Sequence, residues 1–113
     1  MTLRSLALPV AVLVIACVTH GIVVVTGGSM EPALSAGDVC VYRRSADVRP
    51  GQMLVFEREG AGLIVHRAVT VGLHGEVRTK GDANETPDSE LVSRESVRGP
   101  VMLALPVGWL LNR

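Results

Sequence analysis

The sequence predicts a small, mainly β domain preceded by one N-terminal transmembrane helix. Three observations support this fold class. An apolar run from Leu6 to Val25 contains no acidic residue, lysine or arginine. Helical periodicity is absent between residues 38 and 99, and turn residues recur there at strand-like spacing. We therefore expect an anchor at 1–26, a β-domain at 27–99 and an apolar segment at 100–113.

The apolar run is long enough for a membrane-spanning helix, because about 20 apolar residues cross the core of a bilayer. A cleaved secretory signal is the alternative, but the run exceeds the usual length of its apolar region. Arg4 precedes the run. The positive-inside rule then predicts a single-pass protein of the cell membrane, with the β-domain on the extracytoplasmic side.

Strands are expected wherever short apolar or alternating segments lie between turn residues such as Gly37-Asp38 and Pro50-Gly51. The expected strands cover residues 39–44, 53–58, 63–71 and 76–79, and residues 97–105 form a last strand or an apolar strip. Residues 59–62 close a hairpin. The C-terminal apolar segment is too short to span a bilayer, and Trp109 suits an interfacial position. A core strand followed by a frayed tail is the alternative for this segment.

Composition excludes several classes of function. The chain has 113 residues, a formal net charge of zero and no basic block, which argues against a nucleic-acid-binding surface. Cys17 and Cys40 are the two cysteines, and they lack the spacing of a metal site. We expect no cofactor and no metal.

Three segments carry residues suited to nucleophilic catalysis. Ser29 lies in Gly28-Ser29-Met30-Glu31-Pro32, directly after the apolar run, and His66 lies in an apolar strand. Asp82 and Asp88 follow in one loop. A serine hydroxyl needs a base to accept its proton, histidine is the usual base, and a carboxylate orients the ring. Each residue alone is typical of a turn or a core position, but together and in this order they predict a nucleophile, a base and an acidic partner.

These motifs closely resemble the type I signal peptidases, in particular the Ser–His branch of the endoplasmic reticulum, archaea and some Gram-positive bacteria. The resemblance covers nearly the whole chain, including Gly37-Asp38, residues 50–56 and Lys80-Gly81-Asp82-Ala83-Asn84. It implies a signal-peptidase-like β-domain and a membrane-bound serine endopeptidase that removes N-terminal signal peptides after small residues. The implied partners are the signal peptides of exported preproteins, membrane lipid and the secretion machinery.

The resemblance also implies roles for single residues. Ser29 matches the nucleophile, and His66 stands where the commoner bacterial branch has a catalytic lysine. Asp88 matches the third member, and Asp82 matches a supporting acid, which we expect to bond the backbone N–H groups of the loop that follows it. The exchanged assignment is the alternative, because both residues lie within one short loop and the sequence does not say which side chain turns inward. Lys80 does not align with the catalytic lysine.

One position departs from the family pattern. Gly27 stands where bacterial Ser–Lys enzymes carry a Ser or Thr that donates to the oxyanion, which leaves the backbone N–H of Ser29 as the expected donor. Two other functions stay open on the sequence. The chain could be a catalytically silent, membrane-anchored β-domain subunit, or a peptidase dedicated to a few exported proteins.

Overall fold

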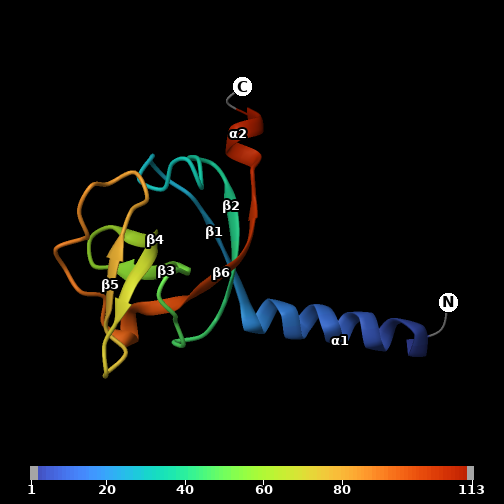
Figure 1. Cartoon of the computed structure of the whole chain (residues 1–113). Coiled ribbons are helices and arrows are strands. Elements are labelled where there is room, and N and C mark those ends of the chain that lie inside the picture. Colours follow the sequence, from blue (N-terminus) through green and yellow to red (C-terminus); the bar gives the residue numbers. More distant parts are fainter. Residues whose placement is uncertain (1–2, 112–113) are drawn as a thin grey trace.

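The N-terminal apolar run forms two elements in the computed structural model, which describes residues 3–111 (Figure 1). Helix α1 spans Leu3–Thr19 and projects away from the rest of the chain, and strand β1 spans His20–Val24. None of the described helices is both long and apolar enough to cross a membrane. The expectation of one helix through Val25 is therefore wrong at its C-terminal end. Ile22, Val23 and Val24 are β-branched and favour a strand, in which Val23 reaches the core.

The predicted mainly β class is confirmed. Six strands form one antiparallel sheet in the order β1-β2-β6-β3-β4-β5. The further strands are β2 Val39–Arg43, β3 Met53–Arg58, β4 Gly62–Val71, β5 Val77–Lys80 and β6 Val97–Leu105. Each lies within about two residues of its expected bounds, because turn residues flank it.

Strand β6 joins the two halves of the sheet. Its last residues pair with β2, and its first residues pair with β3 on the other side. Gly99 lies at this change of partner with φ 151°, and a Cβ there would collide with the backbone of Arg43. Residues 97–105 are thus a strand, and the expected domain boundary at residue 99 falls inside it.

The C-terminal segment continues from β6 into helix α2, Val107–Leu111. Asp38, which is 4% exposed, accepts hydrogen bonds from the backbone N–H groups of Gly108 at 2.9 Å and Trp109 at 3.4 Å. The segment is therefore docked onto the turn that carries Gly37-Asp38. The side chain of Trp109 is half exposed, and residues 112 and 113 lie outside the described part of the chain. The short helix η1, Arg94–Ser96, precedes β6.

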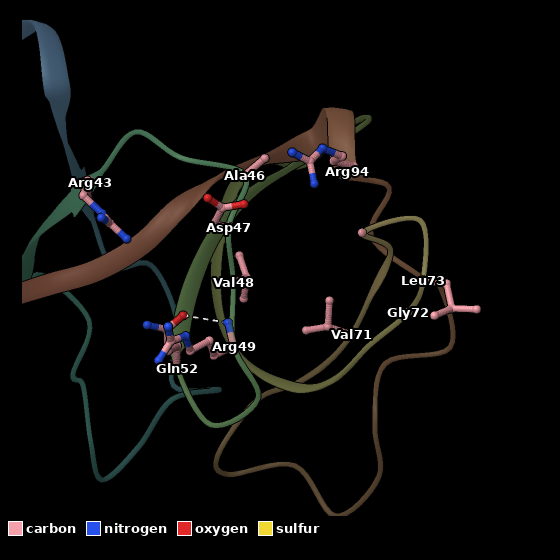
Figure 2. A pocket seen from close by; sticks show the side chains of 11 residues that line it. Arg43, Ala46, Asp47, Val48, Arg49, Gln52, Val71, Gly72, Leu73 and Arg94 are labelled. Carbon is pink, nitrogen blue, oxygen red and sulfur yellow. Dashed lines mark hydrogen bonds between the residues drawn. The ribbon is translucent and has the colours of Figure 1, made fainter.

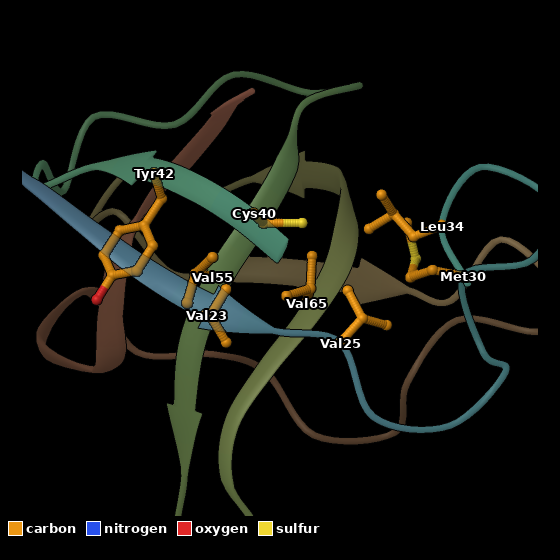
Figure 3. Close-up of a cluster of buried hydrophobic side chains, with 8 residues drawn as sticks. All are labelled: Val23, Val25, Met30, Leu34, Cys40, Tyr42, Val55 and Val65. Carbon is orange, nitrogen blue, oxygen red and sulfur yellow. The ribbon is translucent and has the colours of Figure 1, made fainter. Parts of the chain in front are cut away.

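Two groups of buried side chains form the core. The first lies between β1, β2 and the facing residues of β3 and β4, and Figure 3 shows its members: Val23, Val25, Met30, Leu34, Cys40, Tyr42, Val55 and Val65. The second lies beneath the other half of the sheet and contains Leu54, Phe56, Ala68, Val77, Val92 and Val97. Burial, followed by the nearby charge of Asp38, raises the pKa of the Cys40 thiol, so Cys40 stays neutral and packs as an apolar residue.

Candidate active site

Ser29 is held in a tight turn directly after β1. The turn is closed by hydrogen bonds from Glu31 N to Gly28 O at 3.1 Å and from Leu34 N to Met30 O at 2.9 Å. The side chains of Met30 and Leu34 are 1% exposed and fix the turn to the core (Figure 3). Ser29 itself is partly exposed. Its turn therefore packs on the core while its side chain remains accessible to solvent.

The structure brings Ser29, His66 and Asp88 into one chain of hydrogen bonds. His66 lies on β4, opposite Leu54 of β3, and is 8% exposed. Its Nε2 atom lies 3.0 Å from Ser29 Oγ, and its Nδ1 atom lies 2.6 Å from Asp88 Oδ2. These three residues are 37 and 22 positions apart along the chain, so only the folded sheet assembles them.

The charge of Asp88 decides where the protons lie. Burial of Asp88 acts to raise its pKa, but hydrogen bonds from Thr79 and His66, aided by nearby positive charge, lower the pKa below its ordinary value. An ionised carboxylate only accepts hydrogen bonds. The hydrogen between Asp88 and His66 therefore belongs to Nδ1, which leaves the lone pair of Nε2 to accept the proton of the Ser29 hydroxyl.

Asp82 is bound differently from the expected arrangement. Its two carboxylate oxygens accept from Nε and Nη2 of Arg67 at 2.9 and 2.8 Å. This bidentate hydrogen bonding lowers the pKa of Asp82 and raises the pKa of Arg67. The backbone N–H groups that we expected Asp82 to bind donate elsewhere: Ala83 N to Ser29 O at 2.8 Å, and Asn84 N to Gly81 O at 3.0 Å. Asp82 thus ties its loop to β4, beside His66.

Gly81 lets the loop that carries Asp82 and Asp88, here called the acidic loop, approach Ser29. A Cβ at this position would lie 2.7 Å from Ser29 O and 3.1 Å from Ser29 Cβ. The contact with the backbone oxygen is shorter than folded proteins tolerate, so a larger residue would push the loop away from Ser29. In the sequence, Gly81 stands out only as part of a motif, and nothing assigns a role to Arg67 or Thr79. Arg67 and Thr79 can be recognised only once the fold is known, as polar residues on the strands beside His66 and the loop that carries Asp82 and Asp88.

A hollow of about 240 Å³ lies beside the hydroxyl of Ser29. Its walls come from the end of β1 and the start of β4: Val24, Val25, Thr26, Ser29, Ala61, Leu63, Ile64, Val65 and His66. The lining is mostly aliphatic, with Ser29 and His66 among its polar members. This arrangement can hold an extended apolar segment against a serine and its base.

A larger hollow of about 630 Å³ lies elsewhere, between the segment that follows β2, the turn between β4 and β5, and Arg94 (Figure 2). None of Ser29, His66, Asp82 and Asp88 lines it. Within the described residues, no group of three or more His, Cys, Asp or Glu side chains is placed to hold a metal ion.

The hydrogen bonds that link Ser29, His66 and Asp88 do not include Lys80, Thr26 or the other two histidines. Lys80 Nζ donates to Gly81 O at 3.1 Å. His20 is in β1, where its Nδ1 lies 2.8 Å from Thr19 Oγ1, and His74 is exposed in the turn between β4 and β5. Thr26 lines the hollow beside Ser29.

Comparisons with known proteins point to peptidases. The family model described as Peptidase S24-like matches residues 5–98. The chain is 38% identical over 104 residues to the signal peptidase complex catalytic subunit sec11 of Pyrenophora tritici-repentis, which covers 79% of this chain and 60% of that protein. It is 43% identical over 77 residues to the signal peptidase complex catalytic subunit SEC11C of Homo sapiens, which covers 62% of this chain and 40% of that protein. The chain thus matches no more than about three-fifths of the length of these relatives.

Proposed function

Because the chain belongs to the Peptidase S24-like family, on the type I signal peptidase-like branch that pairs a serine with a histidine, we propose that it is a membrane-attached serine endopeptidase. Its proposed reaction is the removal of N-terminal signal peptides from exported proteins. The observation that carries the proposal is the run of hydrogen bonds from Ser29 through His66 to Asp88 at the edge of an apolar hollow.

In the proposed first step, Ser29 Oγ attacks the carbonyl carbon of the scissile peptide bond while its proton moves to Nε2 of His66. The negative charge of Asp88 stabilises the imidazolium that forms. When the tetrahedral intermediate collapses, the C–N bond breaks and His66 passes its proton to the departing amine. Water, activated by the same imidazole, then hydrolyses the acyl-enzyme and restores the Ser29 hydroxyl.

The oxyanion of the intermediate needs hydrogen-bond donors aimed at the developing charge. We propose the backbone N–H of Ser29 for this role. It lies on the same turn as the attacking atom, and Gly27 offers no side-chain donor.

The free edge of β4 supports recognition of an extended substrate. The pairing of β4 with β5 begins at Arg67, so within the described chain the segment from Gly62 to His66 pairs only with β3. An extended peptide can add its backbone hydrogen bonds to such an edge. The hollow at this edge is small and aliphatic, which suits a preference for small side chains before the cleaved bond.

Exposed apolar side chains on α1 support attachment to a membrane. Leu8 is 73% exposed, Leu13 is 64% exposed and Val18 is 67% exposed. Such a surface is stable in lipid rather than in water. Arg4 lies in the first turn of α1, and by the positive-inside rule we propose that the β-domain faces the extracytoplasmic side.

Two relatives are named as catalytic subunits of a signal peptidase complex. We extend to this chain the proposal that it acts on signal peptides together with further subunits of the secretion machinery. A peptidase dedicated to a few exported proteins remains the second candidate. Comparing the secreted proteins of cells with active enzyme and cells with inactive enzyme separates a general role from a dedicated one.

Ser29→Ala tests the proposal directly. The exchange removes the attacking oxygen and little packing, so it should abolish cleavage of a preprotein while abundance and membrane association stay unchanged. Cleavage is followed by the size of the preprotein on gels, with Ser35→Ala as the matched control on the same turn. Turnover near wild type in Ser29→Ala would show that Ser29 is only a turn residue and that the proposed mechanism is wrong.

A further inference from the structure

Thr79 contacts Asp88 through both its side chain and its backbone. Thr79 lies on β5 and is fully buried. Its hydroxyl donates to Asp88 Oδ2 at 2.7 Å, and its backbone carbonyl accepts from Asp88 N at 2.8 Å. Thr79, a strand residue, thus binds both the side chain and the backbone N–H of Asp88, which belongs to a loop.

The hydroxyl of Thr79 and the ring of His66 meet at the same oxygen. Asp88 Oδ2 accepts from Thr79 Oγ1 at 2.7 Å and from His66 Nδ1 at 2.6 Å. Two donors on one oxygen fix the rotation of the carboxylate group. The positive charge of Arg58 also acts on Asp88, so without the hydroxyl the carboxylate could turn from His66 toward this second attraction.

The pairing of β5 with β4 gives Thr79 a fixed distance from His66. Thr79 pairs with Ala68, two residues after His66 on β4. Asp88, by contrast, lies in the irregular segment between β5 and η1, where regular strand pairing does not hold it. The sheet holds Thr79 in place, and Thr79 can therefore hold the carboxylate of Asp88, which the irregular segment around Asp88 does not fix.

We propose that Thr79 is a positioning residue that holds the carboxylate of Asp88 in line with Nδ1 of His66. This inference rests on the proposed function, because the orientation matters only if His66 is the base. The backbone bond from Asp88 to Thr79 does not need the hydroxyl. The role is therefore separable from the place of Thr79 in the strand.

The test removes the Thr79 hydroxyl in two separate comparisons. Thr79→Val removes it at nearly constant volume, and Thr79→Ala is compared with Thr79→Ser, which differs from it by the hydroxyl alone. Thr70→Val on the neighbouring strand β4 is the control, because Thr70 is exposed. Each full-length variant in detergent micelles is assayed with a fluorogenic peptide that carries alanine at the first and third positions before the cleaved bond. The proton on His66 Nδ1 is observed by NMR without substrate.

We expect Thr79→Val and Thr79→Ala to lower kcat by about tenfold to a hundredfold at unchanged KM, the size expected for a lost hydrogen bond to a charged group. In both variants the Nδ1 proton should exchange rapidly with water, so its NMR signal should be lost. Thr79→Ser and Thr70→Val should keep the turnover and the signal. The Ser and Ala variants keep the comparison valid if Thr79→Val does not fold.

An unchanged Nδ1 signal in the variants without the hydroxyl would overturn the inference, and so would an equal loss of turnover in Thr79→Ser and Thr79→Ala. The NMR measurement needs no turnover, so it distinguishes this failure from failure of the proposed function. If Ser29→Ala remained active while the Nδ1 signal still depended on the hydroxyl, Thr79 would hold the Asp88–His66 pair and the peptidase mechanism alone would be wrong.

Discussion

The two aspartates of the acidic loop have different partners, although only five residues separate them. Asp88 accepts from His66 and Thr79, whereas Asp82 binds the guanidinium of Arg67 through both carboxylate oxygens. The pKa of each aspartate is lowered, mainly by Arg67 for Asp82, and for Asp88 by hydrogen bonds that outweigh its burial. Both are therefore ionised at neutral pH, one beside His66 and one beside the permanent cation of Arg67. Their exchange for asparagine should have separable effects.

Asp88→Asn should lower turnover by about a thousandfold or more with little change in Tm, because an amide cannot stabilise the imidazolium and can favour the wrong ring tautomer. Asp82→Asn should instead lower Tm by a few degrees through loss of a partly exposed ion pair. Turnover and thermal unfolding of both variants measure this. A catalytic defect confined to Asp82→Asn would exchange the two roles.

The pH dependence of Asp82 has a definite sign. A carboxyl group whose pKa is lower in the folded state than in the unfolded state stabilises the fold above the unfolded pKa of about 3.9, and this stability is lost as the pH falls through the folded pKa. Asp82 is such a group. The difference in Tm between wild type and Asp82→Asn should therefore shrink below about pH 4.

His66 is the proposed base, and Lys80 binds only a backbone carbonyl. We expect His66→Ala to be as damaging as Ser29→Ala, and Lys80→Ala to be mild. Turnover of the two alanine variants at neutral pH checks this. An inactive Lys80→Ala beside an active His66→Ala would replace the mechanism with a Ser–Lys one.

At the scale of elements, the contact between the turn that carries Ser29 and the acidic loop holds the site together. Ala83 N donates to Ser29 O, and Gly81 leaves room for this approach. Gly81→Ala should force the loop outward and lower turnover about tenfold or more, since small displacements of reacting groups are costly.

Gly75→Ala is the control for Gly81→Ala. Gly75 has φ 81° and lies beside the side chain of Arg94, and it does not line the hollow beside Ser29. Its exchange should lower Tm through backbone strain but leave kcat unchanged. Equal losses of kcat in the two variants would mean that general destabilisation, and not the contact with Ser29, explains the effect.

The elements themselves were largely predictable from sequence, because turn residues and β-branched runs mark strands locally. Residues 53–58, for example, form β3 as expected. The end of α1 was not predictable, since His20–Val24 are as apolar as the helix before them and only pairing with β2 makes them a strand. The proposed nucleophile and base could be identified from sequence motifs, but the partners of Asp82 and the proposed role of Thr79 depend on side-chain directions that pairing across β4 and β5 decides.

At the scale of the whole molecule, the β-domain and α1 present different surfaces. α1 projects away from the sheet with its aliphatic side chains exposed (Figure 1). At about 1.5 Å per residue, its 17 residues extend roughly 25 Å. The hollow at Ser29 lies at the far end of β1 from α1, so in the proposed peptidase the length of this strand would set how far from the helix a substrate is cut.

Protease added to sealed, right-side-out vesicles should digest the β-domain and spare the apolar residues of α1, which the lipid covers. The physical basis is the exposed apolar surface of α1. Fragments are identified by antibodies against each end, and detergent-opened vesicles are the control. Release of the intact chain by a carbonate wash would contradict attachment through α1, and a fully protected domain would contradict its orientation.

The position of β6 in the sheet has a consequence for the timing of biosynthesis. Ser29 follows β1, whereas His66 and Asp88 belong to β4 and the segment after β5, and within the sheet only β6 pairs with both halves. A ribosome delivers β6 after every residue of the proposed triad. In the nascent chain, Ser29 and His66 thus lie on segments that no strand yet joins. We expect the proposed peptidase to be silent while it is being made and to acquire its activity only when residues 97–105 emerge and pair.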